Sequence, residues 1–317
     1  MTEKRRILIS LNPKAGRRSA VRRAEELRDR LTARGYTAEL LTDLDEVEEK
    51  AKVSFGAGEL RALVGVGGDG TAAELTRRTP AGVPITLLPA GTANLIAKEF
   101  HLPFDPAQAA AVIDAGRTVT LDAATAGGRL FLIMLTAGID AEIVAQVHRN
   151  REEKFRSGTG NQGHIGYRSY LGPVLRSIRR YPYPAIQVES AETDPGTEPL
   201  SVRWAFLFNI PRYGFGAATV TGSDPQDALL DFCGFRCGGL FPSLFGIALA
   251  SLGKSHRFFP GFSFRKNTGF RLTPQEADIQ IPYQIDGDPV GFLPVDIQIV
   301  PNRLTFLVGE KDAAGYR

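Results

Sequence analysis

The stretch from Val64 to Leu75, VGVGGDGTAAEL, constrains the fold more than any other part of the chain. Its four glycines stand between an apolar run and a segment with helical spacing. Glycine has no Cβ, so it lets a backbone turn sharply and approach a ligand closely. The pattern therefore predicts a buried strand, a tight loop and a helix, in that order.

The N-terminal part of the chain repeats this alternation. Short apolar runs are each followed by a loop and a helical segment, and these runs lie at 6–11, 37–41, 61–66 and 84–89. Strands that alternate with helices predict a parallel sheet covered by helices. Residues 1–122 are therefore expected to form an α/β nucleotide-binding domain, and residues 301–317 are a candidate tail that packs back onto it.

The pattern changes after Asp122. Short β-rich runs separated by turn residues are typical of an antiparallel sheet, so residues 123–300 are expected to form a β-sandwich domain. Helical segments at 141–149 and 242–252 interrupt this pattern, and the polar segment 149–170 is expected on the surface. Two domains also agree with a length of 317 residues, which exceeds what one hydrophobic core usually serves.

Composition excludes several classes of protein. A net charge of +3 is too small to indicate nucleic-acid binding. The longest apolar stretches are shorter than the roughly 20 residues of a membrane-spanning helix. Only Cys233 and Cys237 are present, so no disulfide framework is expected and both are interpreted as core residues. These features predict a cytoplasmic protein.

Three loops carry the chemistry. They read NPKAG (12–16), GGDGT (67–71) and PAGTAN (89–94), and each follows a predicted strand. Because parallel strands end at one edge of a sheet, the loops are expected to converge there, where ligands bind in open α/β sheets. Backbone amides and a helix N-terminus suit a phosphate. The alternative is a set of tight turns that only require glycine.

Asp69 places a negative charge in the second of these loops. A carboxylate in a phosphate-binding loop is repulsive unless a cation or a proton lies beside it. The loops match neither the P-loop motif nor the dinucleotide-binding motif. Asp69 therefore favours a phosphate site of a different type.

Six motifs in order resemble those of the soluble diacylglycerol kinase and sphingosine kinase superfamily of lipid kinases, in particular its bacterial diacylglycerol-kinase-like branch. They are NPKAG, GGDGT, PAGTANLIA, TAGIDAEIV, YGFGAATVTGSDPQDALLDF and QIDGDPVG. The resemblance runs nearly from end to end. It implies that the α/β domain binds ATP, that the β-rich domain holds the lipid, and that phosphoryl transfer occurs in a cleft between them.

Carried over motif by motif, the resemblance implies a set of nucleotide-binding residues. They are Asn12, Gly67, Gly68, Asp69, Gly70, Thr71, Gly91, Thr92 and Asn94. Two further candidates are Thr42, after the second strand, and Glu74, one turn into the helix. Glu74 is equally interpretable as a surface residue of that helix.

The resemblance also implies Mg²⁺, with two departures from the pattern. The family's Asp-Gly-Glu is Asp286-Gly287-Asp288 here, and its Asp-Gly-x-Leu-Asp is DALLD from Asp227 to Asp231, with Ala228 in place of glycine. Asp227 and Asp288 are the candidate metal ligands. In some bacterial members this loop binds a structural Mg²⁺, and Ala228 puts its backbone shape in doubt.

Phosphoryl transfer also requires a base for the attacking hydroxyl. Asp286 is the proposed base and Asp69 the competing carboxylate, interpreted as a partner of the metal or of the γ-phosphate. Two carboxylates that met in one cleft would couple their titrations. Judged locally, IDGD is also the sequence of a type I′ hairpin turn.

The implied partner is a lipid alcohol at the inner membrane face, in lipid metabolism such as phospholipid biosynthesis, although the sequence does not specify which lipid. Arginines and tyrosines in YRSYLGPVLRSIRRYPYP (167–184) suit docking to an anionic membrane surface. A homodimer is a further expectation. Two other functions stay open: an NAD kinase-like phosphotransferase, and a catalytically silent regulator that binds lipid or nucleotide.

Overall fold

The computed structural model describes residues 5–11, 18–156, 178–192, 199–213, 223–239 and 261–316. The chain divides into two compact units. One unit runs to Asp122 and resumes at Pro301, and the other lies between Ala123 and Val300.

The first unit contains a parallel sheet in the order β2-β1-β3-β4-β16. Its strands are β1 (Arg6–Leu11), β2 (Thr37–Leu41), β3 (Leu60–Gly67), β4 (Pro84–Pro89) and the last part of β16 (Val295–Leu307). Strands β3 and β4 are almost wholly buried, as expected for strands covered on both faces.

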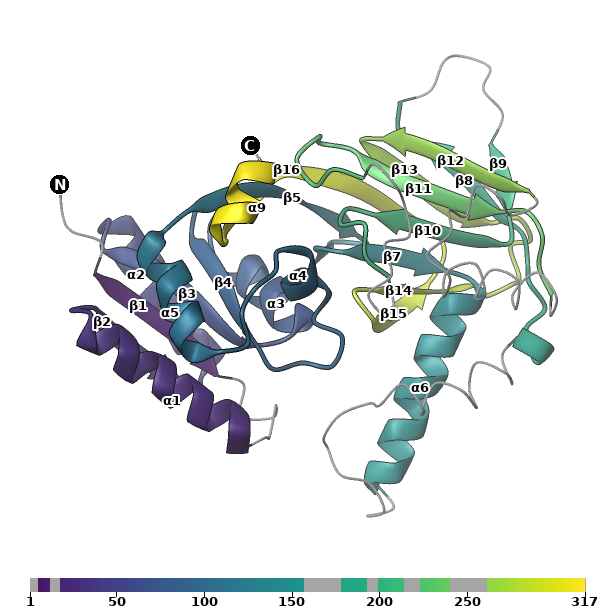
Figure 1. The fold of residues 1–317 in the computed structure, drawn as a ribbon. Coiled ribbons are helices and arrows are strands. Elements are labelled where there is room, and N and C mark those ends of the chain that lie inside the picture. The colour runs from purple at the N-terminus through teal and green to yellow at the C-terminus, as the bar shows by residue number, and fades with distance from the viewer. Residues whose placement is uncertain are drawn as a thin grey trace. The chain divides into compact units, whose positions relative to one another are not determined.

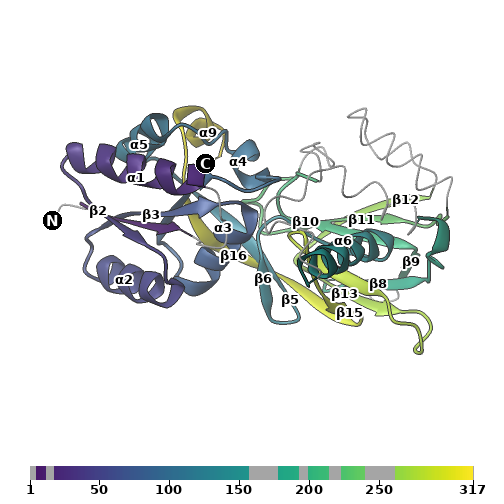
Figure 2. The same ribbon diagram turned by 90° about the horizontal axis from the view of Figure 1, so that it is seen from below.

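Helices cover both faces of this sheet. They are α1 (Arg18–Ala33), α2 (Leu44–Gly56), α3 (Asp69–Arg78), α4 (Leu95–Glu99), α5 (Pro106–Ala115) and α9 (Glu310–Gly315). Figure 2 shows α1 and α5 on one side of the sheet and α2 on the other. Helix α1 buries Ala24, Leu27 and Leu31, whose spacing places them on one face. Asp43 caps α2 and Asp105 caps α5, and each side chain accepts hydrogen bonds from two backbone amides.

The C-terminal residues of the chain pack within this unit. Thr305 and Phe306 of β16 pair with β4. The Tyr316 hydroxyl donates to the Glu99 carboxylate at 2.7 Å, and the buried carboxylate of Asp122 accepts from the Asn302 amide at 2.8 Å.

The second unit is built from antiparallel strands in two sheets (Figure 1). One has the order β12-β11-β10-β7-β14-β15, and the other contains β9, β8, β13 and the first part of β16, with β5 and β6 beside it. The bounds are β5 (Thr118–Ala126), β6 (Arg129–Phe131), β7 (Met134–Ala137), β8 (Ile186–Ser190), β9 (Leu200–Val202), β10 (Trp204–Phe208), β11 (Leu230–Phe235), β12 (Phe262–Asn267), β13 (Gly269–Pro274), β14 (Pro282–Ile285) and β15 (Asp288–Phe292). Helix α6 (Ile139–Arg156) follows β7.

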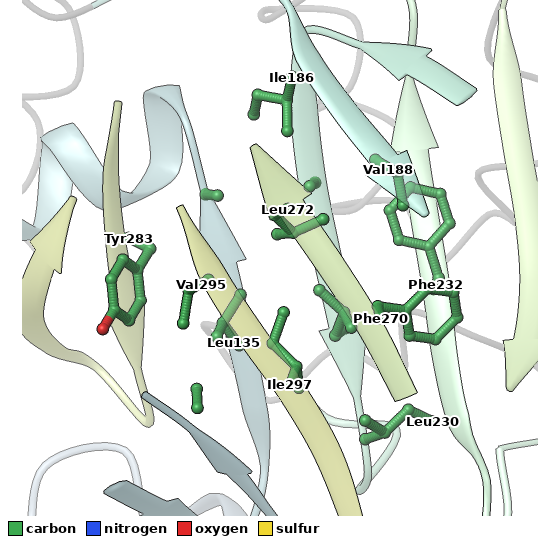
Figure 3. Close-up of a cluster of buried hydrophobic side chains, with 14 of the residues drawn as sticks. Leu135, Ile186, Val188, Leu230, Phe232, Phe270, Leu272, Tyr283, Val295 and Ile297 are labelled. Atoms are coloured by element: carbon green, nitrogen blue, oxygen red, sulfur yellow. The ribbon is translucent and has the colours of Figure 1, made fainter. Parts of the chain in front are cut away.

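A single apolar core fills the space between these two sheets (Figure 3). Leu135 and Phe232 enter it from one sheet, and Phe270 and Ile297 enter it from the other. The rings of Phe232 and Phe270 lie 5.5 Å apart. Side chains that interdigitate from two inner faces define a β-sandwich.

The predicted fold class, a parallel α/β domain followed by an antiparallel β-sandwich, is confirmed. Three details are wrong. The turn residues between VDIQIV (295–300) and LTFLVG (304–309) predict two strands, but Val295–Leu307 form the single strand β16. The helix expected at 141–149 extends to Arg156, and Cys237 is exposed whereas Cys233 is buried. Cys237 lies beyond the end of β11, where the chain has left the core. The helix predicted at 242–252 lies outside the described residues.

Candidate active site

The glycines of two loops in the first unit lock these loops together. A Cβ on Gly91 would lie 2.7 Å from the Cα atom of Gly68, and a Cβ on Gly67 would lie 2.0 Å from the Thr71 hydroxyl oxygen. The Ala90 amide donates to the Gly67 carbonyl at 2.8 Å. Gly70, by contrast, is exposed, and a Cβ there would meet nothing within 4 Å. The loops after β3 and β4 are therefore in direct backbone contact, and this contact requires glycine at Gly68 and Gly91.

Asp69 faces the first turn of α4. Its two carboxylate oxygens accept hydrogen bonds from the Leu95 amide at 3.0 Å and the Ile96 amide at 2.9 Å. The residue is 9% exposed. Burial raises the pKa of Asp69, and the bonds from the α4 amides oppose that rise. Asp69 therefore joins the end of β3 to the start of α4 as a capping group.

Asn94 closes the second loop on itself. Its side-chain oxygen accepts from the Gly91 amide at 3.0 Å, and its amide group donates to the Gly91 carbonyl at 2.9 Å. Its backbone is left-handed, with φ of 48°, a conformation that asparagine tolerates better than most residues. Thr92, between them, is exposed.

The remaining nucleotide-site candidates lie as follows. Thr71 is half-buried in the first turn of α3, and Thr42 is exposed directly after β2. Glu74 binds Arg77 and Arg78 on the surface of α3 at 2.7 and 2.6 Å. Burial acts to raise the pKa of Glu74, but the two arginines outweigh it and lower the pKa overall. Asn12 lies outside the described residues.

In the second unit, Asp286 occupies the turn between β14 and β15. Asp286 and Gly287 both have positive φ, as a two-residue type I′ turn requires. The Asp286 carboxylate accepts three backbone amides, from Leu132 at 2.8 Å, Ile133 at 2.9 Å and Met134 at 3.0 Å. The local hairpin interpretation is therefore confirmed, and the same residue gathers three amides from the segment that leads into β7.

Two further side chains hold this turn. The Gly287 amide donates to the Gln284 side-chain oxygen at 2.7 Å, and a ring nitrogen of His148 lies 3.2 Å from the Gly287 carbonyl. Asp288 is exposed, and one of its oxygens lies 3.9 Å from the same His148 nitrogen. The turn thus has a fixed conformation, held at its carboxylate, its amide and its carbonyl.

The list of candidate residues missed Asp140, at the start of α6. The Asp140 carboxylate accepts from the Thr136 hydroxyl at 2.5 Å and from the Tyr213 hydroxyl, and the Gln284 amide lies 3.5 Å away. Burial raises the pKa of Asp140, and these hydrogen bonds oppose that rise. Gln284 connects this carboxylate to the Asp286 turn. Asp140 is the aspartate of the motif TAGIDAEIV, and its place in that motif is the sequence feature that could have identified it.

Asp227 pairs with a lysine. The Lys266 ammonium lies 2.8 Å from Asp227 and 3.3 Å from Asp231. Burial raises the pKa of Asp231 and would lower that of Lys266, but the two carboxylates raise the Lys266 pKa overall. An ammonium between the two acids does not fit a Mg²⁺ site. Within the described ranges, no three His, Cys, Asp or Glu side chains are grouped to hold a metal.

The described part of the chain contains no helix that is long and apolar enough to cross a membrane. Most of the arginine- and tyrosine-rich segment lies outside the described residues. Its end, Tyr181 and Tyr183, packs edge to face at 5.4 Å, and Tyr183 contacts Trp204.

Most of the first unit matches a known protein family in sequence. Residues 6–126 match the family described as the Diacylglycerol kinase catalytic domain. The superfamily recognised from the six motifs is thereby confirmed.

Curated relatives of this chain carry the description "Probable lipid kinase YegS-like". One from Pseudomonas fluorescens Pf-5 is 30% identical over 168 residues, which cover 52% of this chain and 54% of the relative. One from Pseudomonas aeruginosa UCBPP-PA14 is 32% identical over 123 residues, which cover 38% of this chain and 37% of the relative. The chain spans about half the length of the first relative in this match.

Solved structures extend the likeness in fold to nearly the whole chain. A diacylglycerol kinase from Bacillus anthracis str. Sterne has a TM-score of 0.67 at 15% identity, covering 98% of this chain and 99% of that one. An NAD kinase from Archaeoglobus fulgidus, solved in complex with ATP, has a TM-score of 0.51 at 13% identity, covering 98% and 96%. At these identities the likeness shows the fold alone.

Proposed function

We propose that the chain is an ATP-dependent lipid kinase that transfers the γ-phosphate of ATP to a hydroxyl group of a lipid such as diacylglycerol. The observation that carries this proposal is the match of residues 6–126 to the diacylglycerol kinase catalytic domain. The lipid kinase descriptions of the curated relatives also favour it.

In this proposal the first unit binds the phosphates of ATP at the loops after β3 and β4. Gly70 is exposed in the first turn of α3, and Thr92 is exposed in the second loop. The Thr71 amide already donates to the Gly68 carbonyl at 3.0 Å, so Thr71 is proposed to act through its hydroxyl group. Gly68 and Gly91 keep the two loops in contact, so their amides stay oriented when the nucleotide leaves. Asp69 acts by positioning these loops, because both of its oxygens already bind amides of α4. Asn12 and Thr42 complete the proposed set.

The second unit supplies the acceptor side of the reaction. Asp286 is proposed to accept the proton of the lipid hydroxyl as that oxygen attacks the γ-phosphorus. The three amides that bind its carboxylate fix its orientation. Asp140 is a positioning residue that acts on the turn through Gln284. A positioned base contributes about 10²–10⁴-fold to such a reaction.

A Mg²⁺ ion bound with the nucleotide would neutralise charge on the phosphates, and Asp288 is the residue proposed to hold it. Of the two metal ligands expected from the sequence, Asp288 is exposed, whereas Asp227 is paired with Lys266. The enzyme is proposed to act in the cytoplasm as a peripheral protein at the inner membrane face, and to take part in phospholipid synthesis. A homodimer is part of the same proposal.

The experiment is transfer of labelled phosphate from ATP to a panel of lipid alcohols in mixed micelles, with NAD in a parallel reaction. Labelled lipid in at least one reaction is the expected result. Labelled NADP without labelled lipid would instead establish an NAD kinase, the alternative that the Archaeoglobus fulgidus fold likeness favours. No transfer to any acceptor, with nucleotide or lipid still bound, would support a silent regulator.

The base assignment has its own matched pair of variants. Asp286→Asn is expected to lower kcat by about 10²–10⁴-fold. Asp296→Asn makes the same chemical change on an exposed strand residue of the same unit and is expected to leave kcat within about twofold. Equal kcat values in the two variants would reject Asp286 as the base.

A further inference from the structure

Two acidic residues and a lysine meet where the chain enters β11. Asp231 and Lys266 are direct partners in the antiparallel pairing of β11 with β12. The Lys266 ammonium lies 3.3 Å from Asp231 and 2.8 Å from Asp227, which precedes the strand. The Asp231 side chain is 2% exposed, so its charge requires a partner inside the protein.

Aspartate side chains form hydrogen bonds within the loop before β11. The Asp227 carboxylate accepts from the Leu229 amide at 3.0 Å, and Asp224 accepts from the Gln226 amide at 3.0 Å. Ala228 adopts the left-handed conformation with φ of 57°, which glycine would adopt more easily. One oxygen of Asp227 therefore sets the loop, and its other oxygen binds Lys266.

We propose that the Lys266 ammonium is the resident cation of this loop. It lies between the carboxylates of Asp227 and Asp231, so the loop folds independently of Mg²⁺. This inference concerns the stability of the second unit and does not depend on the proposed kinase activity.

Distances support the exclusion of Mg²⁺. A Mg²⁺ ion bound to the Asp227 oxygen at about 2.1 Å would lie at most about 4.9 Å from the ammonium if the 2.8 Å contact remained. Two cations at that separation repel each other. Mg²⁺ also prefers six oxygen ligands, and the described residues bring only two carboxylates to the lysine.

The experiment measures the Tm of the nucleotide-free, full-length protein in MgCl2 and in EDTA at equal ionic strength. Wild type is expected to show the same Tm within about 1 °C in both buffers, because a ligand that does not bind the folded state cannot stabilise it. A Tm that rises by several degrees in MgCl2, with the rise lost in Asp227→Asn, would overturn the proposal.

A matched pair of variants tests the role of the lysine. Lys266→Met is expected to lower Tm by about 4–8 °C, since it leaves a buried carboxylate without its cation. Lys52→Met removes the same charge from an exposed pair with Glu48 and is expected to change Tm by less than about 2 °C. Equal effects in the two variants would overturn the proposal.

A third variant covers the case in which Lys266→Met does not fold. Lys266→Arg keeps a cation beside both acids and is expected to fold with a Tm within about 3 °C of wild type. Its Tm is also expected to be insensitive to MgCl2. An arginine variant that folds only when Mg²⁺ is present would refute the assignment of the ammonium as the resident cation.

Discussion

Replacing Asp69 by asparagine tests whether this carboxylate is first a structural cap. In the wild type its two oxygens accept the Leu95 and Ile96 amides, and the side chain is 9% exposed. Asparagine offers one oxygen and one NH₂ group, so one of the two amides loses its acceptor and faces a donor. Alanine leaves both amides without an acceptor.

The magnitude follows from these contacts. A buried donor left unsatisfied costs about 1–3 kcal/mol. Asp69→Asn is therefore expected to destabilise the protein by about 1–3 kcal/mol, and Asp69→Ala by about 2–5 kcal/mol. Loss of the buried charge offsets part of the cost in both variants, because burial already raises the Asp69 pKa. At roughly 2–4 °C per kcal/mol, the asparagine variant is expected to melt about 2–12 °C lower.

The assay is thermal and urea unfolding of both variants, followed by the KM for ATP at a temperature where all remain folded. Glu74→Gln is the control, because this carboxylate lies on the same helix but pairs with arginines at the surface. We expect it to change stability by less than about 1 kcal/mol. An Asp69→Asn variant as stable as wild type but inactive would refute the capping argument and return Asp69 to the metal or the γ-phosphate.

Three other substitutions, the first with a control, test a close backbone contact, a buried carboxylate and a left-handed residue. Gly91→Ala places a methyl group 2.7 Å from the Cα atom of Gly68 and is expected to cost about 1–3 kcal/mol in urea unfolding, whereas Gly70→Ala, which meets nothing within 4 Å, is expected to cost less than about 1 kcal/mol. Asp140→Asn is expected to gain Tm relative to wild type as pH rises above about 4, the pKa of an aspartate in the unfolded chain. The reason is that burial raises the pKa of Asp140 in the folded state, so its ionisation destabilises the wild type. The gain is absent below the unfolded-state pKa and becomes constant above the folded-state pKa. Ala228→Gly is expected to raise Tm by about 2–4 °C, because it relieves a left-handed alanine.

The first unit was predictable because local and tertiary signals agree there. Apolar runs of five to eight residues specify the strands β1 to β4, of which β3 ends in glycine and β4 in proline, and helical spacing specifies α1. The partners of Asp69 were not predictable. They depend on how the loop after β4 approaches the loop after β3, a contact between residues 26 and 27 positions apart in the sequence.

In the second unit, register limits what the sequence predicts. The pairing of Asp231 with Lys266 joins strands 35 positions apart through one antiparallel register, and a shift of one residue would turn Lys266 to the other face. The continuity of β16 was missed because Pro301 and Asn302 resemble a turn signal. The strand pairs with different neighbours on either side of that position, so the break in the pattern marks a change of partner.

Comparison with other residues of positive φ shows what Ala228 does to the backbone of the loop before β11. Asn94, Ala228 and Asp286 all have positive φ, which costs a non-glycine residue about 1–2 kcal/mol. The side chains of Asn94 and Asp286 form hydrogen bonds from that conformation that offset the cost, two in the first case and three in the second. The methyl group of Ala228 forms none, yet the loop keeps the backbone shape that suits glycine. The difference from a metal-binding loop therefore lies in Lys266, and Ala228→Gly is expected to raise Tm equally in MgCl2 and in EDTA.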